Sequence, residues 1–164
     1  MMQPAMVPTT MPAQLDHAGI EARIPHRGPM CLLERMTSWS HDRIECVATN
    51  QGGADHPLRT RLGLLATASV EYAAQAMALH GALLASAAGG EASPGYLASA
   101  RDVRLQVWRL DDLGGELVVT AERQAADGGR LLYGFTIHNG GREIASGRVA
   151  VVLNAMAANT VTSP

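Results

Sequence analysis

Residues 62–88 read LGLLATASVEYAAQAMALHGALLASAA, the longest apolar run in the chain and the richest in helix-forming residues. The glycines and the proline in residues 89–95 predict where the helix ends. Glu71 and His80 stand out in this otherwise apolar stretch. A carboxylate in such a helix is costly unless it is paired or used. We therefore predict a buried central helix with Glu71 as a catalytic residue.

The composition indicates one soluble domain. A chain of 164 residues that is 47% hydrophobic can bury a sizeable core, built from Leu, Val, Ala and Met because only 4% is aromatic. The net charge of −2 gives no reason to expect nucleic acid or an anionic membrane as partner. Although residues 62–88 are long enough to span a bilayer, their small polar residues, Glu71 and His80 argue against this.

The chain ends differ from the middle in composition. Residues 1–15 hold three prolines without the basic and apolar regions of a signal peptide, so we predict a disordered leader. Residues 16–153 form the expected domain, and residues 154–164 a flexible tail. Together these features predict a cytoplasmic protein.

The two cysteines suggest no metal or redox site. Cys31 and Cys46 form no CxxC pair and match no metal-ligand spacing, so we expect two reduced, half-buried thiols. We expect no cofactor and no metal.

The remaining sequence predicts strands on both sides of the helix. Residues 16–20 suggest one helical turn, and the prolines of residues 24–30 an irregular loop. Residues 31–36 lead into a strand, with a turn at 37–42. The segments after this turn that read as strands are 43–49, 96–108, 116–124, 130–138 and 142–153.

The turn residues between these segments predict an antiparallel arrangement. Asp127-Gly128-Gly129 and Asn139-Gly140-Gly141 are strong hairpin signals. Two strands, one long helix and a meander of strands make an α+β protein, in which a sheet wraps around one apolar helix. This is the hot-dog arrangement, and we expect a symmetric dimer to bury the apolar surface left over.

Three segments resemble one enzyme family. IPHRGPMCLLER at residues 24–35 resembles the PHR-x-P-x-L-L-x-(D/E)-R opening of the hot-dog 3-hydroxyacyl-acyl-carrier-protein dehydratases. EYAAQ at residues 71–75 resembles the E-x-(M/A)-A-Q of their central helix, and YLASARDVRL at residues 96–105 their next strand. Order and spacing match from about Ile24 to Val152. Within the family, the chain is most similar to the divergent predicted dehydratases of aryl-polyene-like gene clusters.

The resemblance implies a dimeric double hot dog acting on acyl-carrier-protein thioesters. The family's catalytic pair is a loop histidine and a helix carboxylate of the partner subunit, which match His56 and Glu71. The surroundings of His56, DHPL at residues 55–58, depart from the family's GHFPxxP. The His-to-Glu separation is also one residue longer than usual, and the family's Pro-Gly near the helix start is out of register.

Dehydration of a 3-hydroxyacyl thioester needs a base, an acid and a donor to the thioester oxygen, and the sequence offers a candidate for each. A neutral imidazole at His56 suits removal of the C2 proton. Glu71, desolvated and with a raised pKa, protonates the leaving hydroxyl. Backbone amides of the helix N-terminus, at Leu64, Leu65 and Ala66, face the thioester oxygen.

Other candidates have secondary or structural roles. Gln75 orients substrate or serves as a packing amide, His26 is structural or contacts substrate, and Tyr96 lines the tunnel or the core. His80 points away from Glu71, because nine residues are two and a half helical turns. Met30 and Met77 are core residues. An acidic carrier protein requires a basic rim, for which the candidates are Arg59, Arg61, Arg101 and Arg104.

Two alternatives stay open. A thioesterase of the same fold uses a helix carboxylate to activate water. A non-catalytic subunit completes a heterodimer with an active dehydratase, and the altered loop around His56 favours this alternative.

Overall fold

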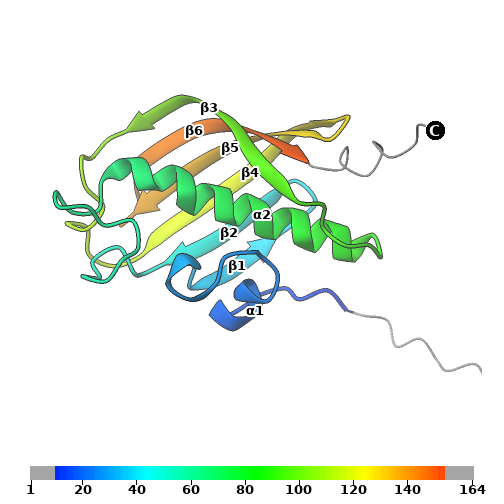
Figure 1. Cartoon of the computed structure of the whole chain (residues 1–164), viewed down its shortest axis with the longest axis horizontal. Coiled ribbons are helices and arrows are strands. Elements are labelled where there is room, and N and C mark those ends of the chain that lie inside the picture. Colours follow the sequence, from blue (N-terminus) through cyan, green and yellow to red (C-terminus); the bar gives the residue numbers. More distant parts are fainter. Residues whose placement is uncertain (1–9, 154–164) are drawn as a thin grey trace, which may run out of the picture.

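The structure is a computed structural model that describes residues 10–153 (Figure 1). One long helix, α2 (Ser69–Ala87), lies across a single six-stranded sheet. The strands are β1 (Arg35–Trp39), β2 (Arg43–Ala48), β3 (Gly95–Leu105), β4 (Leu117–Asp127), β5 (Arg130–Asn139) and β6 (Arg142–Leu153). Three short helices complete the fold: α1 (His17–Glu21), η1 (Gly28–Met30) and η2 (Ala66–Ala68).

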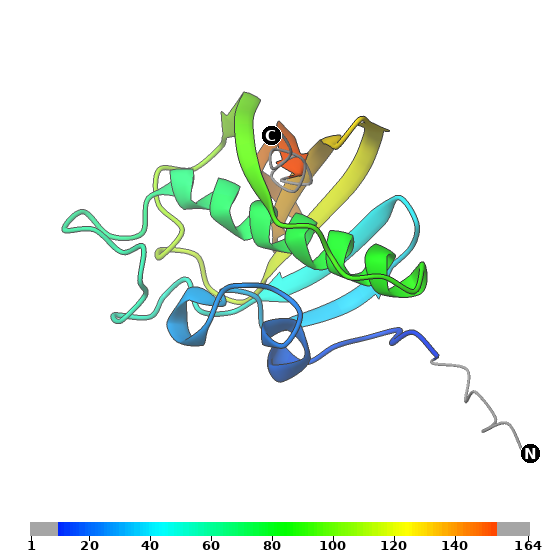
Figure 2. The same cartoon turned by 45° about the vertical axis from the view of Figure 1, so that its right-hand side comes forward.

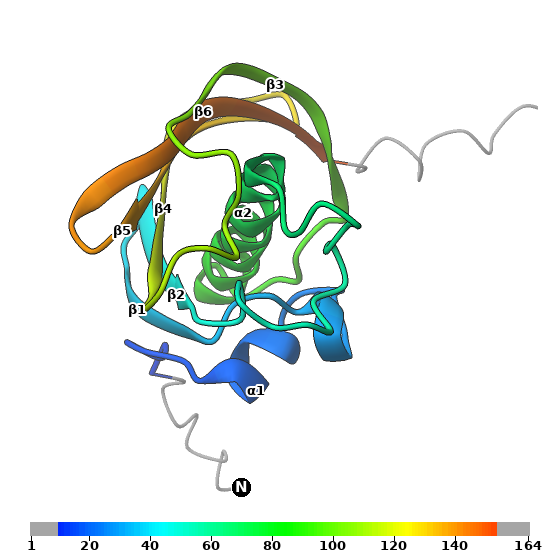
Figure 3. The same cartoon turned by 90° about the vertical axis from the view of Figure 1, so that its left-hand side faces the viewer.

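The sheet is antiparallel throughout and has the order β1-β2-β4-β5-β6-β3. Seen along α2, it curls around the helix (Figure 3), which confirms the predicted hot-dog fold. The hairpin of β1 with β2 and both Gly-Gly turns after β4 and β5 are also confirmed. β3 departs from the predicted meander, because it crosses to the far edge and pairs with β6.

The core lies between α2 and the concave face of the sheet. Tyr72, Ala73, Ala76, Leu79 and Leu83 of the helix are almost completely buried. They pack in one cluster with strand residues that include Ile44, Val119, Phe135, Ile137 and Val149. Among residues 10–153, no helix combines the length and apolarity that a membrane crossing requires.

The central helix begins later than predicted. Residues 62–65 form a loop, in which Leu65 makes an isolated antiparallel bridge with Arg109. Gly63 has φ +98°, and a Cβ there would lie 2.7 Å from a carboxylate oxygen of Asp111. A side chain at this position is therefore excluded both by the backbone conformation and by the space.

The N-terminal segment packs against the strand at the opposite edge from β3. Leu15 pairs with Met36 of β1 through two backbone hydrogen bonds, and the Trp39 indole donates to the Pro12 carbonyl. Contacts with β1 thus begin before residue 16, where the sequence predicts the start of the domain. Residues 1–9 and the tail at 154–164 lie outside the described residues. α1 follows with Asp16 as its N-cap, next to the loop that carries η1 (Figure 2).

Candidate functional site

His56 is a buried loop histidine whose two ring nitrogens are both engaged. It lies between β2 and η2 with 7% of its surface exposed. The Leu58 amide donates to Nδ1 at 3.1 Å, so Nε2 carries the proton. Nε2 lies 2.8 Å from the hydroxyl of Tyr72, which in turn donates to the Asn50 side chain at 2.7 Å. The chain of donors therefore runs from His56 through Tyr72 to Asn50.

The surroundings of His56 favour the neutral imidazole. Burial, and then the positive charge of Arg59, lower the pKa of His56. Burial likewise raises the pKa of Tyr72, so this hydroxyl keeps its proton. The neutral state suits a base, but no lone pair of the ring is free in this arrangement.

Glu71 lies on the first turn of α2 and is more exposed than the sequence predicts. Its side chain is 34% exposed, because the described part of one chain leaves this end of the helix open to solvent. Glu71 Oε1 lies 3.2 Å from Nε2 of His26 and accepts a hydrogen bond from Gln75 at 3.0 Å. The expected desolvated carboxylate is therefore not formed within one chain.

Gln75 joins the central helix to the loop of residues 24–34. It is completely buried. Its oxygen accepts from the Leu32 amide at 2.8 Å, and its nitrogen donates to the Met30 carbonyl at 2.7 Å and to Glu71. Every hydrogen-bonding group of this amide is used, so Gln75 fixes the loop position and holds Glu71 in place.

His56 borders a cleft of about 520 Å³. The cleft is lined by the loop after β2 and by the segment after α1, including Asn50, Asp55, Cys31 and Leu32. Glu71 is not among its lining residues, and the described part of the chain has no hydrogen bond or ion pair between Glu71 and His56. Within one chain, the two catalytic candidates therefore neither bond to each other nor line the same cleft.

The predicted amide donors at the helix start are mostly engaged. The Leu64 amide donates to Asp111 at 3.0 Å and the Ala66 amide to the Trp108 carbonyl at 2.9 Å. Leu65, between them, is the remaining predicted donor. Two of the three amides predicted to face a substrate oxygen thus have partners within the chain, because the segment pairs with residues 108–111.

Asp111 organises this loop as a buried anion. Its side chain is 4% exposed and pairs with Arg109 at 2.6 Å and Arg59 at 3.4 Å. The hydrogen bond from Arg109 is the largest cause that lowers the pKa of Asp111 to about 2. Arg59, a predicted carrier-protein contact, is thus partly neutralised within the chain.

The other predicted residues occupy varied positions. Tyr96 is 56% exposed on β3, not in the core of one chain, and Arg61, Arg101 and Arg104 are exposed. Met77 is buried in the core and Met30 is partly buried. His80 is completely buried on the sheet side of α2, between the Ser40 carbonyl and the Tyr133 hydroxyl, each at 2.8 Å.

Sequence reasoning missed Tyr72 and Asn50. Tyr72 directly follows Glu71, and a tyrosine in so apolar a helix needs a partner for its hydroxyl. That requirement was the available signal. The partner itself follows only from the tertiary structure, because Asn50 lies 22 residues earlier in the chain.

Comparison with solved structures reveals similar folds. One chain of "The Dehydratase Heterocomplex ApeI:P from Xenorhabdus doucetiae" superposes with a TM-score of 0.75 at 23% identity, covering 84% of this chain and 92% of that one. A thioesterase from Haemophilus influenzae gives 0.53 at 16% identity, with 75% and 80% covered. AziG of S. sahachiroi gives 0.50 at 17% identity, with 72% and 88% covered.

Comparison with sequences is more specific for the family. The search of curated proteins gives no significant match. A family model described as "ApeP-like: ApeP dehydratase" matches residues 18–162, which is most of the chain. The chain therefore belongs to the ApeP-like dehydratase family.

Proposed function

We propose that the protein removes water from 3-hydroxyacyl thioesters on acyl carrier protein, giving trans-2-enoyl thioesters in fatty-acid-like or polyene biosynthesis in the cytoplasm. The observation that carries the proposal is His56, a neutral imidazole beside a cleft of about 520 Å³ in a chain of a dehydratase family. Its place before the central helix is that of the family's catalytic histidine, as the resemblance implies. Glu71 is the proposed acid.

The proposed chemistry requires a change at His56. To take the C2 proton, Nε2 needs a lone pair, so its own proton must first move to Nδ1. The hydrogen bond from Leu58 to Nδ1 is then lost, and the Tyr72 hydroxyl must move away from Nε2 so that the lone pair can take the C2 proton. Loss of the C2 proton and departure of the C3 hydroxyl, protonated by Glu71, give the enoyl product and water.

A homodimer formed through β3 is part of the proposal. β3 is an edge strand, and within the described chain it pairs with β6 alone. Tyr96, Leu97 and Val103 on it are exposed by 56%, 41% and 36%. An unprotected apolar edge of this kind favours pairing with a second copy. The opposite edge, β1, is already covered in part by Leu15.

A non-catalytic partner subunit is the second candidate function. The locked ring of His56 favours it, since both nitrogens already have partners within the chain. The similar ApeI:P structure is a dehydratase heterocomplex, and this too supports a heterodimer for the present chain. A thioesterase is the third candidate, in which the partly exposed Glu71 activates water.

One assay separates the three candidates. The purified full-length chain is incubated with 3-hydroxyacyl carrier protein of graded acyl length, and intact-protein mass spectrometry follows the carrier. Loss of water supports the dehydratase, loss of the acyl group supports the thioesterase, and an unchanged carrier supports the partner subunit.

Variants then assign the residues. Glu71→Gln and His56→Asn should each abolish dehydration while circular dichroism and oligomeric state stay unchanged. Glu116→Gln, at an exposed carboxylate paired with Arg35, is the matched control and should keep full activity. Full dehydration by Glu71→Gln would remove Glu71 from the mechanism, and a wild-type chain that leaves every substrate intact would overturn the dehydratase proposal.

A further inference from the structure

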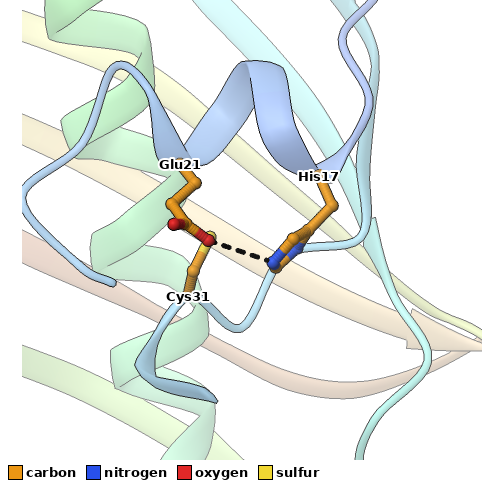
Figure 4. Close-up of side chains that lie close together, drawn as sticks. All are labelled: His17, Glu21 and Cys31. Carbon is orange, nitrogen blue, oxygen red and sulfur yellow. Dashed lines mark ion pairs between the residues drawn. The ribbon is translucent and has the colours of Figure 1, made fainter. Parts of the chain in front are cut away.

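A second cluster of reactive side chains lies beside the cleft but outside the proposed catalytic pair. His17 and Glu21 are the first and last residues of α1, and Cys31 follows η1 (Figure 4). Their ligand atoms all lie within 4.8 Å of one another. His17 and Glu21 are partly exposed and Cys31 is buried. Among residues 10–153, this is the one group of three such side chains close enough to share an ion.

The hydrogen bonds of His17 fix the direction of its free lone pair. Nδ1 lies 2.8 Å from the Leu33 carbonyl oxygen, which can only accept, so Nδ1 carries a proton. Nε2 points instead at the Glu21 carboxylate, 3.5 Å away. In the neutral ring, two lone pairs face each other there, and a cation between them relieves this repulsion.

A proton between His17 and Glu21 relieves that repulsion without involving Cys31, whereas a metal ion binds all three side chains. Tetrahedral zinc, with bonds of about 2.0 Å to oxygen or nitrogen and 2.3 Å to sulfur, separates its ligand atoms by roughly 3.3–3.7 Å. The 3.5 Å between His17 and Glu21 already lies in this range. A backbone carbonyl on the outer nitrogen of a histidine is also the usual support of a metal ligand.

We propose that His17, Glu21 and Cys31 bind a zinc ion. The donor set of one nitrogen, one carboxylate oxygen and one thiolate sulfur suits zinc better than magnesium or calcium, which prefer oxygen alone. Three protein ligands leave the fourth position open. His17 and Cys31 both line the cleft that His56 borders, so the ion would lie beside this cleft.

The site is held in place before any ion binds. Ile20, between the two helix ligands, is completely buried. The Asp16 side chain accepts from the Gly19 amide at 2.8 Å, and Arg27 donates to the Glu21 carbonyl at 2.5 Å. Binding therefore needs small side-chain movements rather than folding of the segment, and the ion would tie α1 to the loop that carries His26 and Met30.

Metal binding and cobalt spectroscopy test the proposal with the full-length protein. After treatment with a chelator and dialysis, the protein is titrated with ZnCl₂ against a chromophoric chelator, and separately with CoCl₂. We expect one equivalent of zinc, a rise in Tm because the ion binds the folded state, and a sulfur-to-cobalt charge-transfer band that requires Cys31.

Variants identify the ligands. His17→Gln and Glu21→Gln should weaken zinc binding by more than about tenfold, since loss of even an outer-shell partner costs that much. Cys31→Ser should remove the charge-transfer band. His41→Gln is the matched control, because His41 pairs with Asp42 at 2.8 Å on the exposed β1–β2 turn and should leave zinc affinity unchanged.

The outcome does not depend on the dehydratase proposal, because the readouts are binding and absorption. If Cys31→Ser, at a buried position, fails to fold, His17→Gln at a side chain 40% exposed still decides the matter. Wild-type protein that binds no zinc, or binds it no more tightly than the His17→Gln variant, overturns the proposal.

Discussion

The Nε2 atom of His56 lies 2.8 Å from the hydroxyl oxygen of Tyr72, and this hydroxyl donates a hydrogen bond to the Asn50 side-chain oxygen. The amide of Leu58 donates a hydrogen bond to the other ring nitrogen, Nδ1. This network sets the tautomer of the candidate base and connects the loop before the helix to the helix itself. It is therefore both a structural tie and the feature that decides whether His56 can accept a proton.

Removing the Tyr72 hydroxyl should destabilise the fold. In Tyr72→Phe the buried His56 N–H loses its acceptor, which costs about 1–3 kcal/mol. Urea unfolding followed by circular dichroism measures the loss. Tyr96→Phe, which removes an exposed hydroxyl, should change the free energy of unfolding by less than about 0.5 kcal/mol. Equal unfolding midpoints for Tyr72→Phe and wild type would contradict the network.

Replacing Gln75 should release the loop of residues 24–34 from the helix. Gln75→Met keeps the volume but leaves the Leu32 amide and the Met30 carbonyl without their partners, at a cost of about 2–4 kcal/mol. Urea unfolding measures that cost, and hydrogen exchange should show faster exchange of the Leu32 amide. Gln106→Met, at an exposed position, is the control. An unchanged Leu32 exchange rate would contradict the anchoring role.

The sequence predicts the elements with strong local signals and misses those set by distant pairing. The hairpin turns at residues 127–129 and 139–141 can be predicted from the sequence, because such turns need positive φ and the glycines there adopt it. The position of β3 in the sheet cannot be predicted from the local sequence, since it depends on pairing with β6, some 50 residues later. The predicted start of the central helix is also too early. Leu64 and Leu65 are good helix formers, but the bridge between Leu65 and Arg109 holds this segment in a loop.

The candidate site is only partly predictable for the same reason. Apolar neighbours in the sequence predict a desolvated Glu71, yet its position on the first turn leaves the carboxylate 34% exposed in one chain. The partner of Glu71 in that chain is His26, which the sequence suggests only as structural or substrate-contacting. The tautomer of His56 depends on Leu58, Tyr72 and Asn50, whose contacts no sequence pattern encodes.

Acid should weaken the loop around Gly63 within a defined pH range. The pKa of Asp111 is about 2 in the folded chain and near 4 when unfolded. Because the folded value is lower, the carboxylate stabilises the fold fully above about pH 4, and this contribution is lost as the pH falls towards about 2. Asp111→Asn should reduce the difference in Tm between pH 6 and pH 3. Asp112→Asn, at a side chain 67% exposed, should leave it nearly as in wild type.

A substitution at Gly63 should disturb the same loop from the backbone side. Gly63→Ala places a methyl group 2.7 Å from Asp111 and 2.8 Å from Arg109 at a φ of +98°, so we expect a lower Tm. Gly128 also has a positive φ, of 55°, but a Cβ there would meet no atom within 4 Å. Gly128→Ala therefore measures the cost of backbone strain without a steric clash. A Tm for Gly63→Ala no lower than that of Gly128→Ala would show that the contact with Asp111 yields without cost.

His80 should give the protein a second pH dependence, near neutrality. Burial is the main cause that lowers the pKa of His80, so the ring stays neutral between Ser40 and Tyr133. The unfolded chain takes up a proton at this residue near pH 6.5, before the folded chain does. Stability is therefore complete above about pH 6.5 and falls as the pH drops towards the folded pKa.

The variant His80→Gln keeps one donor and one acceptor but does not titrate. It should lower Tm at pH 7 and flatten the decline of Tm between pH 7 and pH 5. Some decline should remain, because burial also lowers the pKa of His56. His138→Gln, on β5, should keep the wild-type slope, because His138 is not among the groups that shift the pKa of His80. If Tm of His80→Gln declines between pH 7 and pH 5 as steeply as Tm of the wild type, His80 does not cause the decline. The folded chain would then hold His80 protonated, with the Tyr133 hydroxyl turned to accept its second N–H.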